Sequence, residues 1–174
     1  MNSIWDAVVT VREFMETGGD VLLWILVVTV AMWTLIVERL LYFRRVHPKL
    51  AAEVQQRWDE RDDRTSWYAR RIRRQWISEI EVKLRHSIPM IQSLVALCPL
   101  LGLLGTVTGM MEVFDVMATS GSGNARAMAS GISKATIPTM AGMVAALSGL
   151  YFSISMDRFV DGETERVADN LMHD

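Results

Sequence analysis

The sequence predicts an all-α, polytopic membrane protein with three transmembrane helices. Three segments, residues 21–37, 88–111 and 135–156, contain no Asp, Glu, Lys, Arg or His. A helix rises about 1.5 Å per residue, so the second segment would form a helix of roughly 36 Å, which exceeds the bilayer core of about 30 Å. The first segment opens with an unbroken apolar run, Val-Leu-Leu-Trp-Ile-Leu-Val-Val. Such a run lacks the alternation of a barrel strand, so membrane helices are the prediction.

The N-terminal region is predicted to form a surface helix followed by the first transmembrane helix. In residues 1–19, apolar side chains recur at roughly helical spacing among charged ones. This pattern is typical of an amphipathic helix on the outer membrane surface. Gly18 and Gly19 then allow the chain to turn into the bilayer, where the first transmembrane helix is expected over residues 20–43.

The distribution of basic residues predicts the orientation. Thirteen of the eighteen Lys and Arg residues lie between Arg39 and Arg85, whereas the first twenty residues contain only Arg12. Cytoplasmic loops carry the excess of Lys and Arg, so residues 44–87 are predicted to be a cytoplasmic helical segment. The N-terminus is then periplasmic, and the tail at 157–174 is cytoplasmic.

Two interpretations of the basic segment stay open. It is a solvated helical extension that holds its neighbours together, or its arginines, which include four within residues 70–74, bind anionic lipid. The acids interleaved with them, such as Glu53, Asp59 and Glu79, cancel much of the positive potential that a nucleic acid needs. No nucleic-acid partner is therefore expected.

The second and third transmembrane helices are expected over residues 88–114 and 134–156. Both are predicted to be long and to extend into the cytoplasm. The connection between them, residues 115–133, lies outside and contains the sequence Ser-Gly-Ser-Gly-Asn at 120–124, which predicts a flexible turn.

Small residues are spaced to make smooth faces on these two helices. At intervals of three and four, Cys98, Gly102, Gly105 and Gly109 share one face of the second helix. Small residues let membrane helices approach closely, so this face predicts tight packing. The residues assigned to helix packing are Pro99, Gly102, Gly105, Gly109, Pro138, Gly142 and Ala146.

Hydroxyl groups lie in the same two spans and have two interpretations. Each can donate a hydrogen bond to a carbonyl of its own helix, or line a polar path. Lys134, at the outer edge of the third span, must snorkel, pair or face water. The hydroxyl residues concerned are Thr106, Thr108, Thr136, Thr139 and Ser148.

The three uncharged segments contain no group that titrates near neutral pH. A proton cannot cross the bilayer without a titratable group or a chain of waters, so a protein of this kind that moves protons needs an acid from a partner. No phosphate-binding loop, metal-spaced histidine pair or nucleophile elbow occurs, so neither an enzyme nor a cofactor or metal site is expected. The histidines, His47, His86 and His173, are expected at surface positions.

Two motifs and the order of the segments carry a family resemblance. Residues 99–111 contain a proline followed by the pattern Gly-Leu-x-Gly-Thr-Val-x-Gly-x-Met. A second pattern of mostly small residues lies in and just before the third span, at Gly131, Ile132, Ala135, Thr139, Gly142 and residues 144–146. These two patterns, and the order of spans and polar segments, resemble the MotA/TolQ/ExbB proton-channel family, most closely its ExbB members in the TonB energising system.

The resemblance implies an assembly and a role. It implies a pentameric ring in the inner membrane of a Gram-negative bacterium, enclosing the single-span helices of an ExbD-type dimer whose aspartate carries protons. A TonB-type protein would transmit mechanical work from this assembly to nutrient uptake at the outer membrane, and the proton motive force would drive the process. Thr106 and Thr139 match the threonines that line this ion pathway. Lys134, also assigned to the pathway, stands where family members often carry glutamate.

The sequence therefore leaves several functional interpretations open. The leading one is an ExbB-type motor subunit without enzymatic activity. The alternatives are a TolQ-type subunit of the Tol-Pal envelope system, a structural scaffold with no ion coupling, and a channel that conducts alone.

Overall fold

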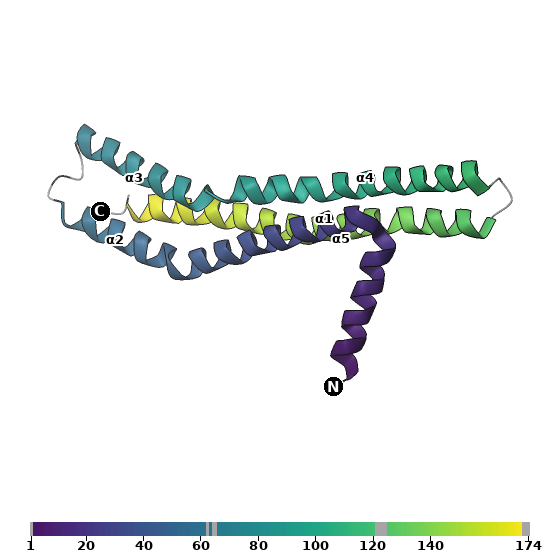
Figure 1. The fold of residues 1–174 in the computed structure, drawn as a ribbon. Helices are drawn as coiled ribbons and strands as arrows, with labels where there is room; N and C mark the ends of the chain where they lie inside the picture. The colour runs from purple at the N-terminus through teal and green to yellow at the C-terminus, as the bar shows by residue number, and fades with distance from the viewer. Residues whose placement is uncertain (1, 62, 64–65, 121–124, 172–174) are drawn as a thin grey trace. The chain divides into compact units, whose positions relative to one another are not determined.

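The computed structural model is almost entirely helical in the residues it describes, which are 2–61, 63, 66–120 and 125–171. Side chains are described from residue 18 onward within these ranges, except at 120, 125 and 127. The helices are α1 (Asn2–Arg45), α2 (His47–Asp59), α3 (Trp67–Arg85), α4 (Ile88–Ser120) and α5 (Ala125–Asn170) (Figure 1). Three stretches are long and apolar enough to cross a membrane, and they contain the three uncharged segments. The all-α class with three candidate spans is therefore confirmed for the described chain.

The break in α1 lies at the paired glycines. Gly19 has φ 68° and ψ −170°, a conformation outside the helical region that costs glycine little because it has no Cβ. The helix resumes after it as the first candidate span. The amphipathic face predicted for residues 1–19 depends on side chains outside the described residues, as does most of the turn predicted at 120–124, and both stay predictions.

Local signals account for the ends of the polar helices. Pro48 sits in the first turn of α2, where its missing N–H removes no helical hydrogen bond. At the start of α3, the Ser66 hydroxyl accepts a hydrogen bond from the Ala69 backbone N–H at 3.1 Å. The α3 helix ends at Arg85, and α4 begins at Ile88 after two intervening residues. Pro99 and Pro138 lie inside α4 and α5.

The chain divides into two compact units, which are described separately. The first contains the residues up to Met32 together with Ser93–Gly149. In it, α4 and α5 lie side by side in opposite directions (Figure 1). Leu22, Ile25 and Met32 of α1 are buried with Val95 and Cys98 of α4 and with Ala135 and Ala145 of α5.

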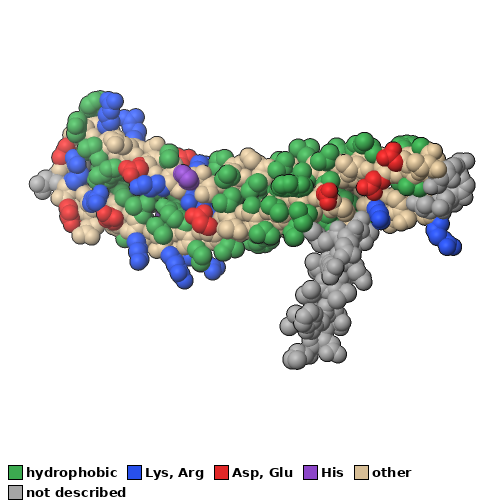
Figure 2. Space-filling model, viewed as in Figure 1, with side chains coloured by type: hydrophobic (Ala, Val, Ile, Leu, Met, Phe, Trp, Pro, Cys, Tyr) green, Lys and Arg blue, Asp and Glu red, His purple; other side chains and the backbone are tan. Residues whose placement is uncertain are grey.

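The second unit, Trp33–Gln92 with Leu150–Asp174, has an aromatic core. Trp33 packs edge-on against Phe152 with ring centroids 5.1 Å apart, and Phe43 packs against Phe159 at 4.7 Å. Trp58 of α2 contacts Trp76 of α3 at 6.1 Å. Lys and Arg side chains gather on the surface of this unit, as the blue atoms in Figure 2 show. The polar segment therefore folds as helices around its own core.

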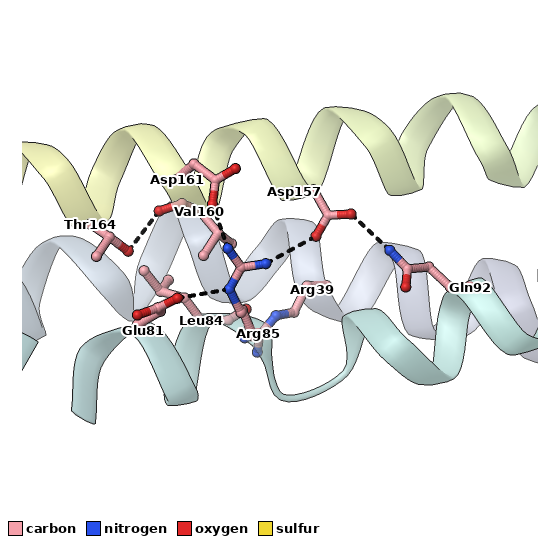
Figure 3. Close-up of polar contacts among 9 residues, drawn as sticks. All are labelled: Arg39, Glu81, Leu84, Arg85, Gln92, Asp157, Val160, Asp161 and Thr164. Atoms are coloured by element: carbon pink, nitrogen blue, oxygen red, sulfur yellow. Dashed lines mark hydrogen bonds and ion pairs between the residues drawn. The ribbon is translucent and has the colours of Figure 1, made fainter. Parts of the chain in front are cut away.

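A polar cluster holds the end of α3 in the second unit (Figure 3). Arg85 bridges Glu81 of its own helix and Asp157 and Asp161 of α5, with an Nε–carboxylate distance of 3.1 Å to Glu81. Asp157 also accepts a hydrogen bond from the Gln92 side-chain amide at 2.7 Å. Arg39, only 3% exposed, donates to the backbone carbonyls of Lys83 and Leu84 in the last turn of α3. A guanidinium from α1 thus satisfies carbonyls that the helix end leaves unpaired.

Replacing Arg39 by methionine is expected to destabilise the protein. Methionine keeps most of the packing volume but leaves the carbonyls of Lys83 and Leu84 without this donor, at a cost of about 1–3 kcal/mol. The midpoint of thermal unfolding in detergent should fall by roughly 5 °C. The exposed neighbour Arg45 is the control, and Arg45→Met should leave the midpoint unchanged. Equal midpoints for the two variants would show that the carbonyl contacts contribute nothing.

The surface position predicted for His47 is wrong. His47 is 4% exposed, and its Nε2 lies 3.7 Å from a Glu163 carboxylate oxygen on α5. Sequence reasoning missed this because Pro48 follows it and made the position look like a helix end. His86 is exposed as predicted, and His173 lies outside the described residues. Burial lowers the pKa of His47 below its ordinary 6.5, Glu163 opposes that shift, and Arg166 and Arg39 add to it.

Acidification is therefore expected to destabilise the second unit. The folded state favours neutral His47, so the unfolded state binds more protons, and stability falls as the pH drops below about 6.5. Thermal midpoints measured from about pH 7.5 to about pH 5.5 should fall less steeply in His47→Gln than in the wild type. The exposed-site variant His86→Gln should retain the wild-type slope. If the midpoint of His47→Gln fell with pH as steeply as that of the wild type, His47 would not be the cause of the acid destabilisation.

Candidate functional site

The small-residue faces of α4 and α5 lie directly against each other in the first unit. A Cβ built on Gly102 would lie 2.9 Å from the Thr139 Cα, and one on Gly109 would lie 2.7 Å from the Ala135 Cα. A Cβ on Gly142 would lie 2.5 Å from the Cys98 carbonyl oxygen. Real Cβ atoms do not approach other atoms this closely, so glycine at these positions sets the distance between the helices.

The two prolines and Ala146 have different surroundings. Pro138 is buried, and its ring occupies the space above Gly105, where a Cβ would lie 2.8 Å from the proline Cγ. Pro99 and Ala146 are partly exposed. Pro138 therefore belongs to the same contact as the glycines, whereas the packing role assigned to Pro99 and Ala146 stays a prediction.

The Thr139 hydroxyl joins the two helices. It donates a hydrogen bond to the Gly102 carbonyl oxygen at 2.8 Å, across a sequence separation of 37 residues. The hydroxyl can reach this carbonyl oxygen because Gly102 has no side chain that would shield its backbone. Thr139 as a residue is partly exposed.

Four further hydroxyls of α4 and α5 donate within their own helices. Thr106 donates to the Leu103 carbonyl at 2.7 Å and is partly exposed. A threonine hydroxyl has one proton to donate and two lone pairs that accept. Once its proton is used on a carbonyl, each hydroxyl can only accept from a further partner. The remaining pairs are Thr108 with Leu104 and Gly105, Thr136 with Ser133, and Ser148 with Ala145.

Lys134 lines a cavity of about 270 Å³ in the first unit, beside the break in α1, together with Asp20 of α1 and with Thr108 and Glu112 of α4. Lys134, Asp20 and Glu112 are all exposed. Sequence reasoning did not bring these charges together, although a signal was present. Each stands directly beside one uncharged segment, at the end that alternating helix directions bring to the same side.

The geometry of the site is that of two closely packed helices. Within the described chain, no three His, Cys, Asp or Glu side chains are grouped so as to hold a metal ion. Many of the exposed side chains of both helices are large and apolar, as at Leu103, Val107, Met140 and Leu147. The site is thus a tight helix pair with accepting hydroxyls, and a cavity with charged side chains lies beside the break in α1.

Comparisons with known proteins agree with these features. A model of the MotA/TolQ/ExbB proton channel family matches residues 44–169. The chain is 42% identical over 71 residues to a putative biopolymer transport protein ExbB-like 1 of Synechocystis, covering 39% of this chain and 28% of that protein.

Two further relatives carry different names within the family. The biopolymer transport protein exbB1 of Vibrio cholerae is 36% identical over 73 residues, covering 41% of this chain and 32% of that protein. The Tol-Pal system protein TolQ of Pseudomonas aeruginosa is 36% identical over 83 residues, covering 48% of this chain and 35% of that protein. The chain thus spans about a third of the length of these relatives. Because the family model matches well over half of the chain, this membrane protein belongs to the MotA/TolQ/ExbB proton channel family.

Proposed function

We propose that this chain is an ExbB-type subunit of a motor driven by the proton motive force. With an ExbD-type partner it would energise TonB-dependent nutrient uptake across the outer membrane. One observation carries the proposal: the spans contain no titratable acid or histidine, yet α4 and α5 present accepting hydroxyls. A partner's acidic side chain would supply the missing proton carrier.

The hydroxyls suit one protonation state of that acid. Thr106 and Thr139 use their protons on carbonyls, so what they offer a partner is oxygen lone pairs. A protonated carboxylic acid donates one hydrogen bond, whereas a carboxylate only accepts. The two threonines would therefore stabilise the protonated acid inside the membrane. The ionised carboxylate would instead be stabilised by the positively charged ammonium group of Lys134.

The proposal includes an assembly and a location. The subunits would form a ring, a pentamer by family resemblance, around the partner helices, and a TonB-type protein would receive the work. The ring would lie in the inner membrane of a Gram-negative bacterium, with the N-terminus periplasmic and the C-terminus cytoplasmic. The concentration of Lys and Arg between residues 39 and 85 supports this orientation.

A TolQ-type role in the Tol-Pal envelope system is the second candidate, favoured by the TolQ relative. The two are separated by expressing the chain in cells that lack either ExbB or TolQ. Restored nutrient uptake would assign the TonB system, and restored envelope integrity would assign Tol-Pal.

The threonines separate the motor from a structural scaffold. Thr106→Val removes a hydroxyl bonded to its own helix, so thermal stability should stay near wild type while proton-dependent uptake falls roughly tenfold. Thr139→Val also removes the hydrogen bond to the Gly102 carbonyl, so stability and uptake should both fall. Thr139→Ser keeps the hydroxyl and should retain both. Uptake is measured in cells lacking their own copy, at matched membrane levels. Wild-type uptake in both valine variants would favour the scaffold.

A further inference from the structure

An amphipathic groove lies in the second unit between α1 and α5. It has a volume of about 290 Å³ and is lined by Leu40, Phe43, Arg44, Phe152, Ser155, Met156 and Phe159. Leu40 and Phe159 are 36% and 40% exposed, so large apolar side chains are accessible within it. The groove needs an apolar occupant over most of its length and a polar one at Arg44 and Ser155.

The groove lies where the apolar spans meet the basic polar segment. Along α1, Arg44 lies one helical turn beyond Leu40, further from the uncharged segment at 21–37. Along α5, Phe152 lies inside the uncharged segment at 135–156 and Phe159 lies beyond it. The groove therefore runs from the apolar spans to the basic polar segment. A phospholipid has the same order, with acyl chains followed by a charged headgroup.

Arg44 is the arginine that lines the groove, and it remains available to a ligand. Arg39 is buried, and its guanidinium donates hydrogen bonds to the carbonyls of Lys83 and Leu84. Arg85 is held by the carboxylates of Asp157 and Asp161. Arg44 is exposed, lines the groove, and forms no ion pair with the residues the structure describes. Asp157 and Asp161 of α5 are thus already paired with Arg85.

We propose that this groove binds one anionic phospholipid. The phosphate contacts the Arg44 guanidinium, with the Ser155 hydroxyl as a second donor, and the upper part of an acyl chain lies against Leu40, Phe43 and Phe152. An arginine near a membrane surface attracts anionic headgroups, and its planar donors match phosphate oxygens. The site does not depend on the proposed motor function.

The test uses the full chain, purified in detergent and titrated with phosphatidylglycerol or phosphatidylcholine of identical acyl chains, with bound lipid counted by native mass spectrometry. Wild-type protein should bind the first phosphatidylglycerol roughly fivefold more tightly than phosphatidylcholine. Arg44→Gln should abolish that preference. Arg45→Gln is the matched control, because Arg45 is exposed next to Arg44 but does not line the groove, and it should retain the preference.

Two further arms examine the groove itself. Ser155→Phe fills the space beside Phe159 and should remove the first bound lipid of either type while leaving the thermal midpoint unchanged. Millimolar inorganic phosphate should not displace phosphatidylglycerol from the wild type. Equal loss of preference in Arg44→Gln and Arg45→Gln would overturn the proposal in favour of general surface attraction. Displacement by phosphate alone would overturn it in favour of a free anion site.

Discussion

Replacing Gly142 by alanine is expected to be the most damaging single-methyl change in the membrane part of the chain. The added Cβ would lie 2.5 Å from the Cys98 carbonyl oxygen and 3.3 Å from the Gly102 Cα. Both are backbone atoms, so no side chain can rotate away, and α5 must move off α4. Overpacking of this kind costs about 1–3 kcal/mol or more. The shift would also lengthen the hydrogen bond between Thr139 and Gly102.

The measurement is thermal unfolding of purified protein in detergent, together with its level in membranes. Gly142→Ala should lower the midpoint by roughly 5–10 °C. Gly162→Ala is the matched control on the same helix, because a Cβ there meets nothing within 4 Å. That change should be neutral or stabilise the helix by about 0.5–1 kcal/mol. A Gly142→Ala midpoint equal to that of Gly162→Ala would mean that α4 and α5 do not pack as described.

The sequence predicted the faces of the membrane helices because periodicity is a local property. Spacings of three and four place Gly102, Gly105 and Gly109 on one side of a helix whatever surrounds it. Which residue each glycine meets is not local. The register that sets Gly109 against Ala135 and Gly142 against Cys98 follows from how two helices pack, and a single helical period does not contain it.

The positions that sequence reasoning missed are those where a polar residue has a distant partner. Arg39 follows an uncharged segment and looks like an interfacial anchor, but it is buried against the end of α3. His47 looks like a surface residue beside a proline, but its partner Glu163 lies on α5. Asp20, Glu112 and Lys134 line one cavity because three helices alternate in direction. In each case the sequence shows the charge, and only the packing shows its environment.

Proton conduction is expected to depend entirely on the partner. The spans carry Thr106 and Thr139 but no Asp, Glu or His, so the chain alone holds no proton at the bilayer centre. A hydroxyl cannot replace an acid, because it does not change charge near neutral pH. The ExbD-type partner would add a carboxylic acid beside these hydroxyls. Conduction should therefore require both chains and the partner's acid.

The most direct measurement is proton flux into liposomes under an imposed gradient, in three preparations. The first contains this chain alone, the second contains it with its ExbD-type partner, and the third contains a partner whose membrane aspartate is replaced by asparagine. The proposal predicts flux above that of protein-free liposomes in the second preparation only. Flux from this chain alone would contradict the claim that the partner supplies the proton carrier, and would identify a self-sufficient channel instead.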